Sequence, residues 1–218
     1  YNLGTVFQAQ GKLDEASDCY QKAISFKPDY ADAHNNLGSL FKERGLLDKA
    51  LSAYQHAISF RPDFVEALNN LGAALKDQGR LEEAASSCLQ ALSFRPDFAE
   101  AHNNLGAIFK YQGKLEEAVN CYQKAISIKP NFAEAYNNLG VALQEQGKFK
   151  EAAECCLQAL ALKPDSAEAL YNLGNTLHLQ GALENATGNY QQALLLKPDY
   201  AEAHNNLGNV LKDRGQLD

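Results

Sequence analysis

A single spacing of 34 residues governs this 218-residue sequence from end to end. The pair Leu-Gly recurs at that interval, with no insertion or deletion, at Leu3-Gly4, Leu37-Gly38, Leu71-Gly72, Leu105-Gly106, Leu139-Gly140, Leu173-Gly174 and Leu207-Gly208. A second glycine, an alanine and all six prolines keep the same register. Such a period indicates one supersecondary unit copied along the chain, because a unit this small buries its apolar face only against its neighbours.

Residues 31–64 illustrate the pair of helices that the sequence of each unit predicts. Leu37, Leu40 and Phe41 form the apolar stripe of a first helix, which Gly45 ends. A second helix follows, with an inner face made of Leu47, Ala50, Leu51, Tyr54, Ala57 and Ile58. Small residues such as Gly38 and Ala50 allow the two helices to approach closely. Tyr54, or Cys88 and Cys156 at the equivalent positions, is expected to fill the remaining gaps.

Acidic residues at the start of each unit predict capped helices. Asp63 follows Pro62 and is itself followed three residues later by Glu66, which is the spacing of a capping box. The same spacing or a close equivalent occurs at Asp29/Asp32, Asp97/Glu100, Asn131/Glu134, Asp165/Glu168 and Asp199/Glu202. We therefore expect these side chains to cap the first helix of each unit.

The order of residues in each unit resembles the tetratricopeptide repeat over the whole chain. That order is Leu-Gly, then an alanine with tyrosine or cysteine four residues later, then alanine and proline. The sequence departs from the family at an early aromatic position, where the family often has tryptophan and this chain has none. The resemblance implies an all-α fold: an α-solenoid of antiparallel helix hairpins wound into a right-handed superhelix, with the first helices lining its concave side.

The period divides residues 1–218 into a single array. Residues 1–30 form a nearly complete repeat and residues 201–218 a partial one, with five full repeats between them at 31–64, 65–98, 99–132, 133–166 and 167–200. A solenoid end needs a polar cap, whereas the last helix is expected to expose Leu207, Val210 and Leu211. We therefore expect a fragment of a longer chain, or end-to-end self-association through the uncapped terminal repeats.

Composition narrows the class of partner. The net charge is −7 and no run of like charges stands out, which argues against nucleic acid. No stretch approaches the ~18–20 consecutive apolar residues of a membrane span, so no membrane partner is expected. The five cysteines are odd in number and lack the C-x-x-C spacing of zinc or redox sites. They indicate a reducing compartment, and we expect a cytoplasmic location.

One polar position recurs in every unit, although helix formation does not require it. Asparagine precedes each Leu-Gly pair, at Asn2, Asn36, Asn70, Asn104, Asn138, Asn172 and Asn206. Asparagine costs ~0.5 kcal/mol relative to alanine inside a helix, so seven copies indicate that the amide has a task. Its donors and acceptor suit the N–H and C=O groups of an extended peptide. A local structural role for the amide is the alternative.

These asparagines resemble the asparagine ladder in the tetratricopeptide superhelix of O-GlcNAc transferase and its bacterial and plant relatives. That ladder holds substrate proteins by their backbone, and the resemblance implies that the seven asparagines face the concave groove. Candidates for flanking positions are Asn35, Asn69, Asn103, Asn137 and Asn205, together with Lys42, Lys76 and Lys110. For the lysines, solvated surface charge is the alternative explanation. Acids and amides occupy the neighbouring positions, so a basic clamp for a terminal carboxylate is not expected.

No catalytic, phosphate-binding or nucleotide-binding motif occurs, so we expect neither an enzyme active site nor a metal or cofactor. The main hypothesis is a protein-interaction scaffold whose asparagine-lined groove binds extended peptide segments of protein partners. The alternative is the substrate-targeting arm of a glycosyltransferase, with a catalytic domain outside this chain.

Overall fold

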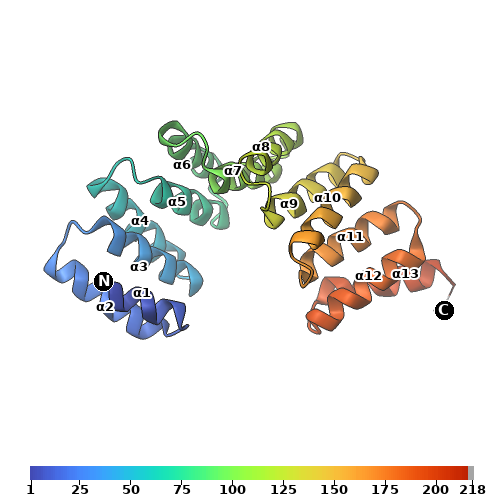
Figure 1. Cartoon of the computed structure of the whole chain (residues 1–218), viewed down its shortest axis with the longest axis horizontal. Helices are drawn as coiled ribbons and strands as arrows, with labels where there is room; N and C mark the ends of the chain where they lie inside the picture. Colours follow the sequence, from blue (N-terminus) through green and yellow to red (C-terminus); the bar gives the residue numbers. More distant parts are fainter. Residues whose placement is uncertain (216–218) are drawn as a thin grey trace. The chain divides into compact units, whose positions relative to one another are not determined.

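A computed structural model describes residues 1–215 of the chain, and within them it contains thirteen α-helices and no strand (Figure 1). Expectations for residues 216–218, the end of the partial repeat, lie outside the described residues. The helices form two compact units, Tyr1–Gln112 and a second that begins at Gly113. The predicted all-α class is confirmed. No helix among the described residues is both long and apolar enough to span a membrane.

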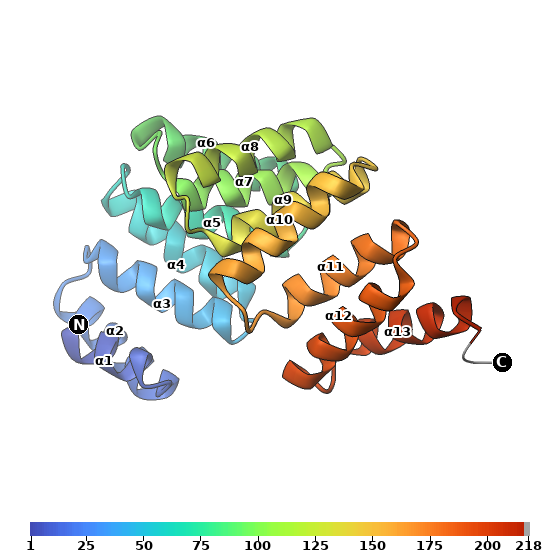
Figure 2. The ribbon, with the colours of Figure 1, turned by 45° about the vertical axis from the view of Figure 1, so that its right-hand side comes forward.

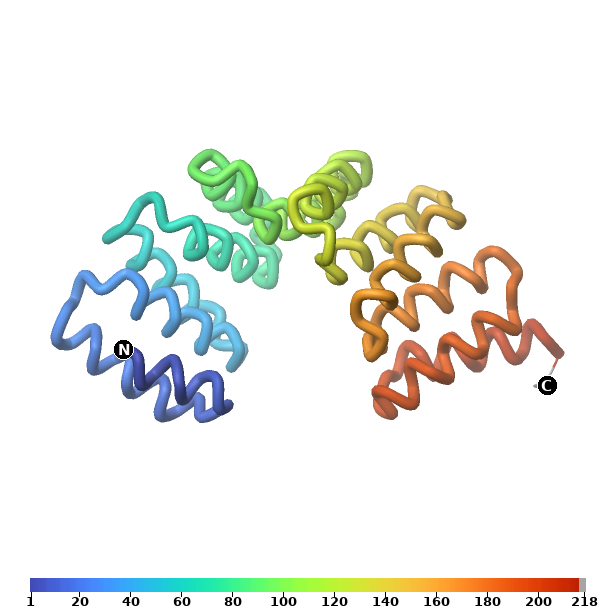
Figure 3. Tube along the Cα trace, in the orientation of Figure 1, coloured from blue at the N-terminus to red at the C-terminus, as the bar shows by residue number. Residues whose placement is uncertain are grey.

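Each unit is a succession of helical hairpins joined by short turns (Figure 3). The helices of the N-terminal unit are α1 (Asn2–Ala9), α2 (Leu13–Phe26), α3 (Ala31–Glu43), α4 (Leu47–Phe60), α5 (Val65–Asp77), α6 (Leu81–Phe94) and α7 (Ala99–Tyr111). The helices of the C-terminal unit are α8 (Leu115–Ile128), α9 (Ala133–Glu145), α10 (Phe149–Leu162), α11 (Ala167–Leu179), α12 (Leu183–Leu196) and α13 (Ala201–Asp213).

Glycine and proline end the two helices of each hairpin for different reasons. Gly45 follows α3 with a φ of 71°, a left-handed conformation that favours glycine and stops the helix. Pro62 follows α4, and the residue before it, Arg61, is driven out of helical geometry to φ −139° and ψ 89°. The connections are therefore short, and each helix folds back on its predecessor.

A glycine in each first helix lets the paired helices come into close contact. A β-carbon built on Gly38 would lie 2.7 Å from Cε1 of Tyr54, and one on Gly72 would lie 2.6 Å from Sγ of Cys88. Both distances are far inside van der Waals contact, so only glycine fits against these buried side chains. The predicted gap-filling role of tyrosine and cysteine is thereby confirmed. Ala50, one turn before Tyr54, is completely buried.

Within each unit, the first helices of successive repeats also touch one another. Helix α3 contacts α5, and α5 contacts α7; in the C-terminal unit, α9 contacts α11, and α11 contacts α13. Second helices inside a unit pack between two first helices, as α4 does between α3 and α5 and α10 does between α9 and α11. Figure 2 shows this alternation for α11, α12 and α13. The first helices thus provide a continuous face in each unit, on which residues 34 positions apart become neighbours.

The expected capping boxes are wrong. The residues at the N-caps of α3, α5, α7, α9 and α13 are Tyr30, Phe64, Phe98, Phe132 and Tyr200, and none of them makes a side-chain cap hydrogen bond. Only at α11 does a side chain cap these helices: Ser166 Oγ accepts from the backbone N–H of Ala169 at 3.2 Å. Each of these helices starts one residue later than the sequence pattern predicts, because the residue after the expected cap occupies the N-cap position.

The expected exposure of α13, the first helix of the partial repeat, is also wrong in part. Val210 is completely buried in a cluster with Ala186 and Tyr190, and Leu207 packs against that cluster. Leu211 is half-buried. Helix α13 therefore covers much of its apolar stripe by packing on α12.

The close helix approach predicts opposite effects for two Gly→Ala substitutions. Gly38→Ala should destabilise the protein by about 1–3 kcal/mol, since the new methyl group collides with Tyr54. Gly188→Ala, inside α12 with no atom within 4 Å of the new β-carbon, should stabilise it by about 0.5–1 kcal/mol. Urea denaturation followed by circular dichroism measures both. Equal effects of the two substitutions would contradict the packing argument.

Candidate functional site

The asparagines that precede Leu-Gly lie on the first helices of both units. Asn36, Asn70 and Asn104 are half-buried on α3, α5 and α7. On α9 and α13, Asn138 and Asn206 are also half-buried, whereas Asn172 on α11 is buried and Asn2 on α1 is exposed. We call this side of the first helices the asparagine face, and treat it separately in each unit.

The residue before each of these asparagines lies deeper in the molecule. Asn35, Asn69, Asn103 and Asn137 are all buried, with exposed fractions between 8% and 2%. Asn205, on the last helix, is exposed. Four of the five flanking asparagines therefore lie beneath the face rather than on its surface.

Hydrogen bonds between successive repeats join the two sets of asparagines. Asn70 Nδ2 donates to Asn35 Oδ1 at 3.0 Å, and Asn104 Nδ2 donates to Asn69 Oδ1 at 2.8 Å. In the C-terminal unit, Asn172 Nδ2 donates to Asn137 Oδ1 at 2.9 Å. We call each such bond, between residues 35 positions apart, a rung. It holds first helices together and satisfies the oxygen of a buried amide, so the asparagines have a structural role.

A tyrosine hydroxyl replaces the amide oxygen in two rungs. Asn36 Nδ2 donates to the Tyr1 hydroxyl at 3.0 Å, and Asn206 Nδ2 donates to the Tyr171 hydroxyl at 3.1 Å. The position before the ladder is therefore asparagine or tyrosine because both can accept a hydrogen bond. Burial raises the pKa of Tyr1, and the Asn36 amide opposes that shift. The sequence shows this restriction to two acceptors, whereas the pairing of each acceptor with the asparagine 35 positions later becomes visible only in the structure.

The rungs made by Asn70 and Asn104 leave part of these two amides available. In the structure, Asn70 and Asn104 each use one N–H, while the second N–H and Oδ1 make no bond to the protein. Both residues are half-buried rather than covered. Each can therefore offer one donor and one acceptor to a ligand while its rung stays intact.

Charges on the asparagine face of the N-terminal unit are largely paired. Lys42 and Lys76 both approach Asp77, at 3.4 and 3.5 Å. Lys110 lies over the ring of Tyr111, with Nζ 5.4 Å from its centroid. The lysines thus have partners on the molecule, and exposed pairs of this kind contribute little to stability.

The acids expected to cap helices instead bridge to the end of the repeat. Asp32 accepts two hydrogen bonds from Arg61, and Glu66 accepts one from Arg95 at 2.8 Å. These side chains are roughly half exposed, so the pairs help to position the turn more than they stabilise it. Together with the lysine pairs, they leave this face with balanced charge.

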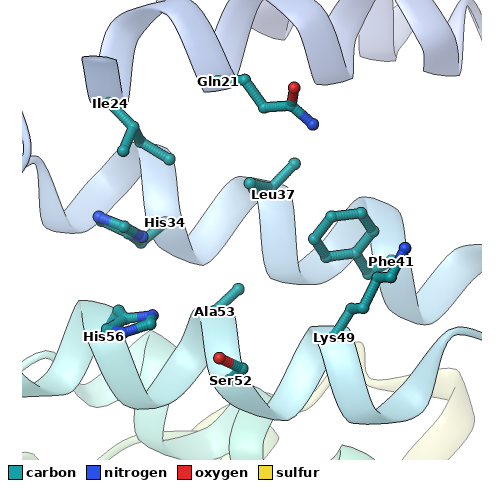
Figure 4. Close-up of a pocket in the computed structure, with 9 residues that line it drawn as sticks. All are labelled: Gln21, Ile24, His34, Leu37, Phe41, Lys49, Ser52, Ala53 and His56. Carbon is teal, nitrogen blue, oxygen red and sulfur yellow. The ribbon is translucent and has the colours of Figure 1, made fainter. Parts of the chain in front are cut away.

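A separate hollow lies between α2, α3 and α4, lined by none of the asparagines. Figure 4 shows its side chains: His34 and His56 lie at one end, Phe41 and Lys49 at the other, and Leu37 and Ala53 between them. The cavity volume is about 320 Å³. His34 Nε2 lies 2.9 Å from the carbonyl oxygen of Pro28, which accepts its hydrogen. No acid lines this hollow.

Neither a disulfide nor a cluster of metal ligands is found in the described part of the chain. All five cysteines lie within residues 1–215, and none of them forms a disulfide. Burial raises the pKa of the Cys121 and Cys155 thiols to about 11, which lowers their reactivity. No group of three or more His, Cys, Asp or Glu side chains gathers there as a metal site would require.

Helix hairpins repeated every 34 residues, with a glycine at each closest approach, define a class of protein: the chain is a tetratricopeptide-repeat protein. The family described as the Cilia and flagella-associated protein 70 C-terminal domain matches residues 1–209. The chain belongs to this family. A comparison with curated proteins finds no significant match.

Solved structures with the same fold cover nearly the whole chain. A crystal structure of the APC/C hetero-tetramer Cut9-Hcn1 matches with a TM-score of 0.89 at 20% identity, covering 96% of this chain and 42% of that one. A structure of Pseudomonas aeruginosa pilF matches with a TM-score of 0.80 at 21% identity, covering 95% of each chain. YrrB, described as a TPR protein with an unusual peptide-binding site, matches with a TM-score of 0.61 at 23% identity, covering 87% and 98%. At these identities the likeness concerns the fold.

The rungs predict that Asn69 and Asn104 are energetically coupled. Asn104→Ala should lower the free energy of unfolding by about 1–2 kcal/mol, because it leaves the oxygen of buried Asn69 without a donor. The double substitution Asn69→Ala with Asn104→Ala should be little worse than the single one, giving a coupling of about 1 kcal/mol. Urea denaturation of the four proteins in this cycle measures the coupling. Additive effects would show that the rung contributes nothing.

Proposed function

We propose that the chain is a protein-interaction scaffold whose asparagine face binds an extended peptide segment of a partner protein through its backbone. One observation carries the proposal: Asn70 and Asn104 each retain an N–H and an Oδ1 after forming their rungs. They stand one repeat apart on adjacent helices, so they offer the same donor and acceptor twice in a row. Binding rather than catalysis is therefore the proposed activity.

The spacing of the repeats suits an extended chain. Packed helices lie about 8–10 Å apart, and an extended strand advances about 3.3–3.4 Å per residue. A bound segment would therefore meet one asparagine about every third residue. Contacts made to the backbone at that interval impose little sequence preference, and ordering a flexible ligand lowers the net affinity.

The balanced charge of the face supports this mode of binding over a charged clamp. Arg61 and Arg95 already pair with acids, and Lys42 and Lys76 share Asp77. A ligand that used these cations would have to displace an existing partner. The family name and the printed descriptions of YrrB and of Cut9-Hcn1 are consistent with protein or peptide partners, and proteins of cilia and flagella are the first source of segments to test.

Two pairs of substitutions separate binding from structure. Asn70→Ala with Asn104→Ala removes the amides that would contact the ligand and also breaks two rungs. Asn35→Ala with Asn69→Ala breaks the same two rungs by removing their buried acceptors, and it leaves the amides of Asn70 and Asn104 in place. The first pair should weaken binding about tenfold or more, and the second pair should change it little.

The measurement uses sixteen-residue peptides selected by display against the whole chain, with binding followed by fluorescence anisotropy. Circular dichroism confirms that both double variants keep their helices. The best peptide is also made in three N-methylated forms, each methylated at every third backbone nitrogen and starting from a different residue. One of these forms should bind the unsubstituted chain more weakly than the other two. If both pairs of substitutions weakened binding equally, the asparagines would act only by stacking the repeats.

A further inference from the structure

An aromatic residue and a cation occupy the turn between repeats at five places. The cation lies over the face of the ring in each of them, with distances between 4.2 and 5.3 Å to the ring centroid. The five pairs are Lys27 with Tyr30, Arg61 with Phe64, Arg95 with Phe98, Lys129 with Phe132 and Lys197 with Tyr200. The turn is therefore built around a ring stacked beneath a positive charge.

The ring covers a floor formed mainly by alanine side chains. Phe64 packs on Ala31, Ala57 and Ala67. One repeat later, Phe98 packs on the equivalent residues Val65, Ala91 and Ala101. The ring thus closes the space between the start of one first helix, the end of the second helix and the start of the next repeat.

The turn between α10 and α11 lacks this ring. Ser166 stands at the aromatic position, and its hydroxyl is directed to the backbone N–H of Ala169. A cavity of about 230 Å³ lies there instead, with Ala133 and Ala159 among its walls. These are the equivalents of Ala31 and Ala57, the floor that Phe64 covers. Lys163, the equivalent of Arg61, also lines the cavity.

The cavity lies beside a rung of the C-terminal unit. Asn137 and Glu168 line it, and Asn137 Nδ2 donates to Glu168 Oε1 at 3.1 Å. The oxygen of the same Asn137 accepts the rung from Asn172 at 2.9 Å. Ala133 and Glu134 at the start of α9, and Ser166 and Glu168 at the start of α11, line the cavity, so a peptide that crosses these two helix starts passes its mouth.

We infer that this cavity receives an aromatic side chain, phenylalanine or tyrosine, from the bound peptide segment; the inference rests on the proposed function. The ligand's ring takes the place that the protein's own ring takes in the other five turns. It lies on Ala133 and Ala159, with the ammonium of Lys163 over its face, while the carboxylates of Glu134 and Glu168 face its electropositive edge. The two acids disfavour an acidic side chain at this place. The C-terminal unit thus recognises one aromatic anchor at this turn in addition to peptide backbone.

The test compares two peptides on the whole chain. One is the best display-selected peptide with a single phenylalanine, and the other carries alanine in its place. The phenylalanine peptide should bind about tenfold more tightly or better, since its ring is removed from water. Leucine should recover only part of this gain, because it fills space without offering a ring face to Lys163.

Ser166→Phe supplies the matched variant, because it installs the residue that other repeats carry and should fold at least as well. It should abolish the difference between the two peptides and leave binding of the alanine peptide unchanged. Ser166→Ala, which removes the cap but keeps the cavity open, should preserve the difference. A difference that survives Ser166→Phe would overturn the inference.

A small probe separates this inference from the proposed groove. N-acetylphenylalaninamide, observed by its effect on amide resonances of the whole chain, should shift signals of Ala133, Ala159 and Ser166, and Ser166→Phe should remove those shifts. N-acetylglycinamide, which has the backbone without the ring, should not shift them. If no peptide bound, the proposed function would be wrong. If these shifts were absent in the natural chain, the inferred aromatic site would be wrong.

Discussion

The close contact between a glycine of one helix and a side chain of the next underlies the helix hairpins inside each unit of this protein. Gly38 lies so near the ring of Tyr54 that a single added carbon would collide with it. The contact sets how near the paired helices come, and this decides whether Ala50 and its equivalents are sealed from water. Because the same contact recurs every 34 residues, the hairpins are alike enough to stack in register. The first helices can then present a repeating surface.

Stacking and binding use the same amides. Each rung takes one N–H of Asn70 or Asn104 and leaves the rest of the group at the surface. An alanine substitution at these positions alters stability and the surface at once, so loss of binding after such a change has two explanations. The buried acceptors Asn35 and Asn69 separate them, because they belong to the rung but not to the surface. The structural role does not compete with the proposed contact to peptide, since an asparagine amide has two N–H donors and an oxygen with two lone pairs, and a rung uses only one N–H.

Departures from the repeat mark the places where the protein differs from a uniform solenoid. Ser166 stands where the other turns carry a ring, and a cavity lies beside it. Tyr1 and Tyr171 stand where the other rungs use asparagine, and their hydroxyl groups preserve the hydrogen bond. The first departure removes a packing element and the second conserves an acceptor. Only the first creates space for a ligand, which explains why a site is inferred there.

The sequence by itself determined the helix hairpins, their 34-residue period and the buried faces, because these depend on local signals: left-handed glycines, proline after the second helix and apolar stripes. It failed at the helix starts, where Asp63 and Glu66 have the spacing of a capping box but Phe64 occupies the N-cap and Glu66 pairs with Arg95. Only the tertiary structure decided which acceptor receives the hydrogen bond from the Asn70 amide and how much of that amide remains exposed. The reason is physical: residues 29 or 35 positions apart become partners only after the hairpins have stacked, and no local pattern records the distance between them.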